Sequence, residues 1–298
     1  TDADDTDEAL GNFDGISYAK GASTLRQLAT WVGDEAFVAG LRAHLRAHQF
    51  GNATLDDFVA AVTHSSGRNV GVWADRWLRT AGVSTLSVET ATHQGHYTGA
   101  RIVQTVPDGH PIPRPHRLLI GLYDRDEGQL VRRAALEVDV EASHSTALPA
   151  LVGERPADLV LPNDGDLTFA LTSLDPASLA TVLGHLDELA DPLARALVWT
   201  TLWQMVGAGL LAPADYLRVV RRGASDADTS AVTAMVLARA TTAATLWSGP
   251  ARDSRTQELA SWCLERARAL TPGGDVQLEL VRAWAGVTGD VDLLQTWV

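Results

Sequence analysis

Cysteine and lysine are scarce in this chain of 298 residues, and no apolar run approaches the roughly twenty residues of a membrane span. The single cysteine, Cys263, excludes an internal disulfide framework and is typical of a reducing compartment. The net charge of −13 argues against a nucleic-acid partner, because phosphate binding requires a basic surface. We therefore expect a soluble, cytoplasmic protein with no nucleic-acid and no membrane partner.

Several catalytic motifs are also absent, including the His-Glu-x-x-His zinc motif, the Gly-x-Ser-x-Gly elbow and phosphate-binding glycine loops. The nearest approach to a metal motif is residues 44–48, where His44 and His48 lie one helical turn apart without an internal glutamate. We interpret them as a solvated histidine beside a histidine at the core edge. Four further histidines lack acidic partners at ligand spacing, so we predict surface positions for them: His93, His96, His110 and His116.

Apolar spacing predicts four short helices in the first eighty residues. The apolar series from residue 25 to residue 32 has helical spacing and stops at Gly33. Thr54 and Asp57 have the spacing of a capping box, which marks the start of a helix. The predicted helices lie near residues 16–32, 37–45, 54–66 and 70–78.

A series of segments in register carries a resemblance to a known enzyme family. The segments are Tyr18–Ser23, Gly33–Phe37, His48–Asn52, Ser66-Gly67 and Trp77–Val83. In this order they resemble the end of the catalytic domain of zinc metalloaminopeptidases of the aminopeptidase N family. The resemblance is continuous from Asn12 to about Leu86 and weaker beyond. It implies that the full-length enzyme hydrolyses the N-terminal residue from peptide substrates.

Within this resemblance, Tyr18 matches the tyrosine of the family's Tyr-x-Lys-Gly motif. The match implies that Tyr18 is catalytic and stabilises the oxyanion formed when a zinc-activated water attacks the first peptide bond. A tyrosine hydroxyl suits this role because it is protonated at neutral pH and donates a hydrogen bond. The other interpretation is that Tyr18 only packs its ring at a helix start. We expect Lys20 to be a local charge partner and Gly21 to serve close packing or turn geometry.

The chain departs from the family at the metal. Such enzymes hold zinc with His-Glu-x-x-His and a later glutamate, and this motif does not occur here. The resemblance therefore implies that zinc is bound by a missing N-terminal half of the same protein, and that this fragment is inactive alone. We also expect the helical start to expose an apolar surface that packs on the missing half. The last residues continue an apolar helical pattern, so we expect the natural protein to extend further.

From Ser84 the helical spacing gives way to period-two patterns and β-branched runs. Asp126-Glu127-Gly128 between two such runs predicts a hairpin turn. The predicted strands cover residues 86–89, 97–106, 117–123 and 130–140. Several short strands in under ninety residues are typical of a small antiparallel β-sandwich. We find no chemistry in this region and interpret it as a spacer.

From Ser173 the pattern is helical again, with Asp-Pro helix starts at Asp175 and Asp191. Further helices are predicted to begin near Ala212, Asp226, Arg252 and Gly274. Cys263 falls in a helical apolar pattern and is expected to be buried and inert. Aromatic residues at helical spacing are more often core than ligand platform, so we assign these tryptophans to the core: Trp199, Trp203, Trp247, Trp262, Trp284 and Trp297.

The sequence thus predicts a multidomain α+β fold in three parts. Residues 1–83 form the C-terminal helical part of the metallopeptidase catalytic domain, residues 84–171 a β-sandwich, and residues 172–298 a truncated, HEAT-like α-solenoid. Two alternatives to the aminopeptidase remain open. One is a non-catalytic helical and β adaptor that binds a protein partner, and the other is a related epoxide-hydrolysing enzyme.

Overall fold

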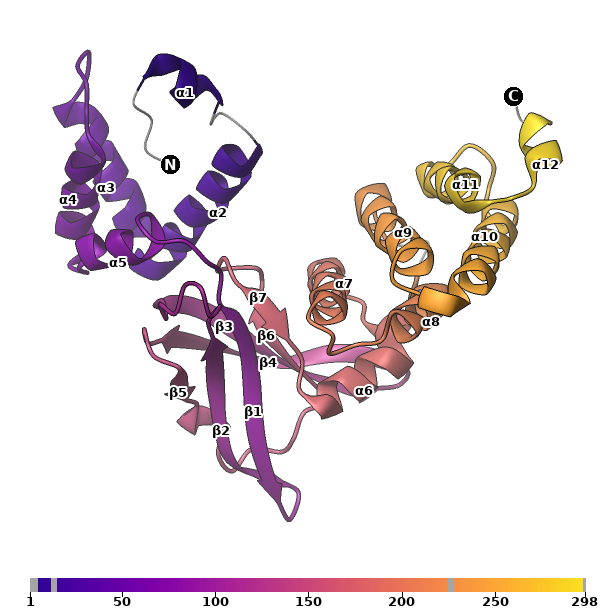
Figure 1. The fold of residues 1–298 in the computed structure, drawn as a ribbon. Coiled ribbons are helices and arrows are strands. Elements are labelled where there is room, and N and C mark those ends of the chain that lie inside the picture. Colours follow the sequence, from indigo (N-terminus) through magenta and orange to yellow (C-terminus); the bar gives the residue numbers. More distant parts are fainter. Residues whose placement is uncertain (1–4, 12–14, 225–227, 297–298) are drawn as a thin grey trace. The chain divides into compact units, whose positions relative to one another are not determined.

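The structure of the chain, a computed structural model, is a mixed α+β fold, as predicted (Figure 1). It describes residues 5–11, 15–224 and 228–296. Two compact units are present. The first comprises residues 1–121, 134–156 and 162–172, and the second residues 122–133, 157–161 and 173–298. Within the ranges described, we find no helix of the length and apolar character that a membrane span requires.

Helices open the first unit, and their ends follow local sequence signals. They are α1 (Thr6–Gly11), α2 (Gly15–Val32), α3 (Asp34–Ala47), α4 (Leu55–Ser66) and α5 (Val70–Trp77). The four predicted helices are confirmed as α2 to α5. The predicted capping box is also present, since Asp57 N–H donates to Thr54 Oγ1 at 3.3 Å and Thr54 N–H donates to Asp57 Oδ2 at 2.8 Å. Gly67, with a φ of +67°, ends α4 in the left-handed conformation.

Gly40 allows α3 to pack closely on α4, its neighbour in Figure 1. A Cβ at position 40 would lie 2.7 Å from Ser65 Oγ and 2.9 Å from Val62 Cα. The apolar core of these helices is small and contains two stacked tryptophans, Trp31 and Trp73, with ring centroids 6.3 Å apart. Its buried members are Leu28, Val32, Val62, Val70, Trp73, Ala74 and Trp77.

The strands of the described residues form two small sheets. They are β1 (Thr85–His93), β2 (His96–Thr105), β3 (His116–Asp126), β4 (Gln129–Val140), β5 (Ser145–Ala147), β6 (Leu159–Asp164) and β7 (Leu171–Ser173). One sheet has the order β5–β2–β1–β7 and the other β4–β3–β6. The predicted turn after Asp126 is confirmed, because Glu127 and Gly128 have φ values of +47° and +81°, as a two-residue hairpin requires.

Helices dominate the second unit. They are α6 (Pro176–His185), α7 (Pro192–Gly207), α8 (Pro213–Gly223), α9 (Ser230–Thr245), α10 (Arg252–Ala269), α11 (Asp275–Val287) and α12 (Val291–Gln295). The Asp-Pro starts are confirmed, since Asp175 and Asp191 each accept two backbone N–H bonds at the N-termini of α6 and α7. Asp226 lies outside the described residues, and α9 is capped by Thr229 instead.

The core of the second unit joins these helices to strand residues such as Tyr123 and Leu159. Trp199 and Trp284 are buried as predicted, and Trp297 lies outside the described residues. The core assignment of Trp247 is wrong: the residue is 44% exposed, and its ring stacks on Trp203 with centroids 4.7 Å apart. Cys263 is buried as predicted, and burial raises the pKa of its thiol to about 12, which keeps it protonated and unreactive.

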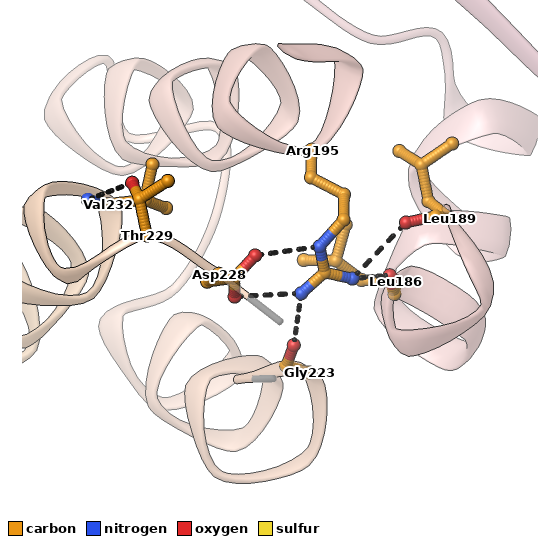
Figure 2. Close-up of polar contacts among 7 residues, drawn as sticks. All are labelled: Leu186, Leu189, Arg195, Gly223, Asp228, Thr229 and Val232. Carbon is orange, nitrogen blue, oxygen red and sulfur yellow. Dashed lines mark hydrogen bonds and ion pairs between the residues drawn. The ribbon is translucent and has the colours of Figure 1, made fainter. Parts of the chain in front are cut away.

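A buried arginine on α7 connects four segments of the second unit (Figure 2). Nε and Nη2 of Arg195 donate to the two carboxylate oxygens of Asp228, each at 2.9 Å. Nη1 donates to Leu186 O at 2.6 Å, and Nη2 also donates to Gly223 O, at the end of α8, at 2.9 Å. The side chains of Arg195 and Asp228 are only 6% and 8% exposed. Water therefore solvates these charges poorly, and each charge stabilises the other.

We predict that Arg195→Met destabilises the second unit by about 3–5 kcal/mol, because it removes the guanidinium group that pairs with a buried carboxylate and donates to buried backbone carbonyls. The measurement is urea unfolding of the chain. The matched control is Arg221→Met. Arg221 pairs with Glu258, and the two side chains are 36% and 53% exposed. That change should stay within about 1 kcal/mol. Equal losses for the two variants would contradict the role of Arg195.

Candidate functional site

Tyr18 is the fourth residue of α2, and its side chain is 66% exposed. From residue 18 to residue 23, α2 has no buried position. The buried face begins at Thr24 and continues through Gln27, Leu28 and Val32. The half of α2 that carries Tyr18 therefore projects from the unit, and its other half is anchored.

An apolar groove with a volume of about 550 Å³ lies among α2, α4 and α5. Three of its leucines, Leu25, Leu55 and Leu78, are 44–50% exposed. Tyr18 precedes Leu25 by seven residues, so helical periodicity puts both on one face of α2. The groove is lined by Lys20, Gly21, Thr24, Leu25, Leu28, Leu55, Phe58, Val59, Val70, Trp73, Ala74, Trp77 and Leu78.

The packing role predicted for Gly21 is wrong within the described structure. Gly21 lies in the interior of α2, where no turn is made, and a Cβ there would meet no atom within 4 Å beyond its own helix. Glycine in a helix interior costs about 1 kcal/mol relative to alanine. Lys20 is exposed, and its role as a charge partner stays a prediction.

Behind α2, three buried polar side chains from distant segments form a hydrogen-bonded chain, which we call the α2 anchor: Gln27, Thr168 and His116. Gln27 Oε1 accepts from Phe169 N–H at 2.7 Å and from Thr168 Oγ1 at 3.0 Å. His116 Nδ1 lies 2.7 Å from Thr168 Oγ1. The three side chains are 1%, 5% and 1% exposed.

The loop between β6 and β7 holds Thr168 in place. Asn163 Oδ1 accepts the N–H groups of Leu167 and Thr168 at 2.9 and 3.0 Å, and Asn163 Nδ2 donates to Thr168 O at 3.0 Å. Asn163 itself has a φ of +58° and is 3% exposed. Arg26 adds a second tie between α2 and this loop, because its Nη2 donates to Gly165 O at 3.0 Å.

The surface position predicted for His116 is wrong, whereas His93, His96 and His110 are exposed as predicted. His116 opens β3, bonds to Thr168 and packs edge-on against Trp77 with ring centroids 5.1 Å apart. Burial, followed by the charge of Arg114, lowers its pKa to about 3. The imidazole is therefore neutral at physiological pH.

Within the part of the chain that the structure describes, no three His, Cys, Asp or Glu side chains meet as metal ligands. The rings of His44 and His48 have centroids 5.1 Å apart, and both residues are half-buried rather than one of them solvated. A structural or catalytic zinc site needs at least three protein ligands. The residues present here do not fit one.

Two families match parts of this chain. Residues 1–77 match the Peptidase family M1 domain, and residues 159–297 match the ERAP1-like C-terminal domain. The chain is 41% identical over 294 residues to aminopeptidase N of Streptomyces lividans. The matched region covers 95% of this chain and 34% of that relative. Glutamyl aminopeptidase of Bitis rhinoceros is 45% identical over 91 residues, 30% of this chain and 10% of that protein.

A solved structure has a similar fold. Aminopeptidase A of Legionella pneumophila, in complex with aspartic acid, superposes with a TM-score of 0.59 at 14% identity and covers 95% of this chain and 36% of that one. The chain is thus similar to aminopeptidases of the aminopeptidase N type, and its first part matches the domain model of peptidase family M1. It spans about a third of the length of the Streptomyces relative.

The two helix glycines offer a matched test of packing. We predict that Gly40→Ala lowers the free energy of unfolding by about 1–3 kcal/mol, because its Cβ would overlap α4. Gly21→Ala should raise it by about 1 kcal/mol, because the added methyl meets nothing and the helix gains alanine's propensity. Chemical unfolding measures both, and a loss of stability in Gly21→Ala would mean that this glycine packs closely after all.

We predict that His116 makes stability depend on pH. Its pKa is about 3 in the folded chain and about 6.5 when unfolded, so the unfolded state binds the additional proton between those values. Stability should therefore fall as pH drops from 6.5 toward 3, by up to about 1.4 kcal/mol per unit from this residue.

His116→Asn should remove this contribution and make the plot of unfolding free energy against pH shallower. The control is His93→Asn, at an exposed histidine, which should leave the slope unchanged. Urea unfolding at steps between pH 6.5 and 4 measures the slopes. An unchanged slope in His116→Asn would contradict the assigned protonation state.

Proposed function

We propose that this chain is part of a zinc-dependent aminopeptidase that hydrolyses the N-terminal residue from peptides. The observation that carries the proposal is the 41% identity to aminopeptidase N over 95% of the chain. Relatives with the names glutamyl aminopeptidase and aminopeptidase A also match, each over 91 residues or 30% of this chain. Because the chain spans about a third of the Streptomyces relative, the activity belongs to a longer protein of which this is one portion.

In this proposal Tyr18 supplies the hydrogen bond that stabilises the transition state. When water attacks a peptide carbonyl, negative charge develops on the carbonyl oxygen, and a preorganised hydroxyl donor stabilises that charge selectively. The 66% exposure of Tyr18 supports the role, because a buried ring would have no access to substrate. Its place in a segment where no residue from 18 to 23 is buried also supports the role.

Zinc enters this proposal as a group that other residues of the longer protein hold, because the described residues offer no ligand set. The partners are then the peptide substrate and the remaining portion of the same protein. The apolar groove among α2, α4 and α5 supports such a contact, because exposed apolar patches of this kind mark interaction surfaces. A location in the cytoplasm remains a prediction.

The proposal includes a finer architecture. We propose that the two sheets pack as a β-sandwich, and that the helices from α6 onward stack as a HEAT-like solenoid. The antiparallel pairing of β1 with β2 and the succession of contacts α8–α9, α9–α10 and α10–α11 support it. The division at residues 83–84 and 171–172 stays a prediction.

We predict that Tyr18→Phe in the full-length protein lowers kcat about 10²–10³-fold toward an aminoacyl anilide, with KM and zinc content unchanged, because only a transition-state interaction is removed. The control is Ser23→Ala, which removes an exposed hydroxyl from another face of α2 and should leave kcat unchanged. Loss of zinc in Tyr18→Phe, or unaltered turnover, would defeat the role of Tyr18.

The same assay separates the enzyme from the alternative of a non-catalytic adaptor. The adaptor hypothesis predicts no hydrolysis by the full-length protein and no effect of Tyr18→Phe on anything but partner binding. The aminopeptidase proposal predicts hydrolysis by the full-length protein and none by residues 1–298 alone.

A further inference from the structure

In the α2 anchor, the donor and the acceptor of each hydrogen bond can be assigned. Phe169 N–H is a donor only, so the atom of Gln27 that faces it is the amide oxygen. This oxygen is an acceptor only, so the Thr168 hydroxyl donates to it. The hydroxyl has no second proton, and His116 must then donate from Nδ1 to Thr168 Oγ1. Nδ1 of His116 therefore carries a proton, and the low pKa of this buried ring leaves Nε2 without one.

The anchor holds α2 just after the segment that carries Tyr18. Residues 18–23 have no buried position, and the buried face of the helix begins at Thr24. Gln27 lies nine residues after Tyr18, about 13 Å along the axis at the rise of an α-helix. A tilt of about 5° at Gln27 would move Tyr18 by about 1 Å over this distance.

Apolar contacts of Leu28 and Val32 also hold the anchored half, but they differ in kind. Apolar burial is non-directional, so it tolerates small rotations of a helix. Hydrogen bonds weaken with misalignment, and a buried group that loses its partner carries a large penalty. The bonds of Gln27 therefore restrict the tilt and rotation of α2 more sharply than its apolar contacts do.

We propose that Gln27, Thr168 and His116 are positioning residues for Tyr18, so that the strand region helps to set the geometry of catalysis. This inference rests on the proposed function, because it assumes that Tyr18 acts in the transition state. Displacement of a catalytic group by about 1 Å can cost about 10²-fold in rate. The interpretation of residues 84–171 as a spacer without chemistry would then be incomplete, since His116 and Thr168 belong to that segment.

The test is Thr168→Val in the full-length protein, which keeps the side chain's shape and removes its hydroxyl. We expect kcat to fall about tenfold or more, with KM within about twofold, because an interaction confined to the transition state is weakened. Thr168→Ser keeps the hydroxyl and should restore kcat. The control Thr146→Val removes a hydroxyl from β5, elsewhere in the first unit, where it accepts from Glu141 N–H at 3.1 Å, and should leave kcat unchanged.

A double-mutant cycle distinguishes positioning from general destabilisation. If the anchor acts through Tyr18, Thr168→Val should cause no further loss of kcat in the Tyr18→Phe background. If the two losses multiply, the anchor is only structural and the inference is overturned. An unchanged kcat in Thr168→Val, or a loss that Thr168→Ser shares, overturns it as well.

Thermal unfolding identifies any variant that fails to fold. Gln27→Met, which has similar length and no hydrogen-bonding groups, replaces Thr168→Val in the cycle if the latter does not fold, with the same outcomes. Failure of the proposed function appears separately, as a Tyr18→Phe protein with unaltered kcat. If this inference alone fails, Tyr18→Phe still has a low kcat. In that case the substitution at Thr168 or Gln27 either leaves kcat unchanged or lowers it by a factor that multiplies with the loss in Tyr18→Phe.

Discussion

The hydrogen bonds to the amide oxygen of Gln27 are the constraint on which the candidate site depends. They connect the anchored half of α2 to Phe169 and Thr168, and through Thr168 to His116 at the start of β3. All these groups are buried or nearly so, where an unmade hydrogen bond costs about 1–3 kcal/mol. These hydrogen bonds therefore favour one arrangement of α2 relative to β3 and to the residues that precede β7.

The projecting half of α2 is built differently from the anchored half, and this difference is informative about function. Between residues 18 and 23 the helix exposes its side chains and includes Gly21, which lowers helix stability and relieves no clash in the described structure. A segment selected for stability alone would carry alanine there. The exposed leucines of the neighbouring groove also add little to stability, because they bury only part of their apolar surface within this chain.

Much of the fold was predictable because its signals are local. The capping box of Thr54 and Asp57, the Asp-Pro starts of α6 and α7 and the turn after Asp126 each involve residues within four positions of one another. Strand β6 was not predicted, because all six of its residues are buried, so it shows no alternation, and Pro162 interrupts its short apolar run. Strands β5 and β7 have only three residues each, too few for a period-two pattern.

The candidate site was predictable only in part, for the same reason. Tyr18 was found through a motif, whereas the residues that hold its helix come from segments up to 142 positions apart. His116 was assigned to the surface because it lacks an acidic partner at ligand spacing, whereas its contacts in the structure, Thr168 and Trp77, are distant in sequence. Gln27 did carry a signal: it falls on the same helical arc as Thr24 and Leu28, where a polar residue requires a buried partner. Local patterns thus single out Tyr18 as a candidate, whereas the tertiary hydrogen bonds that hold its helix become visible only in the structure.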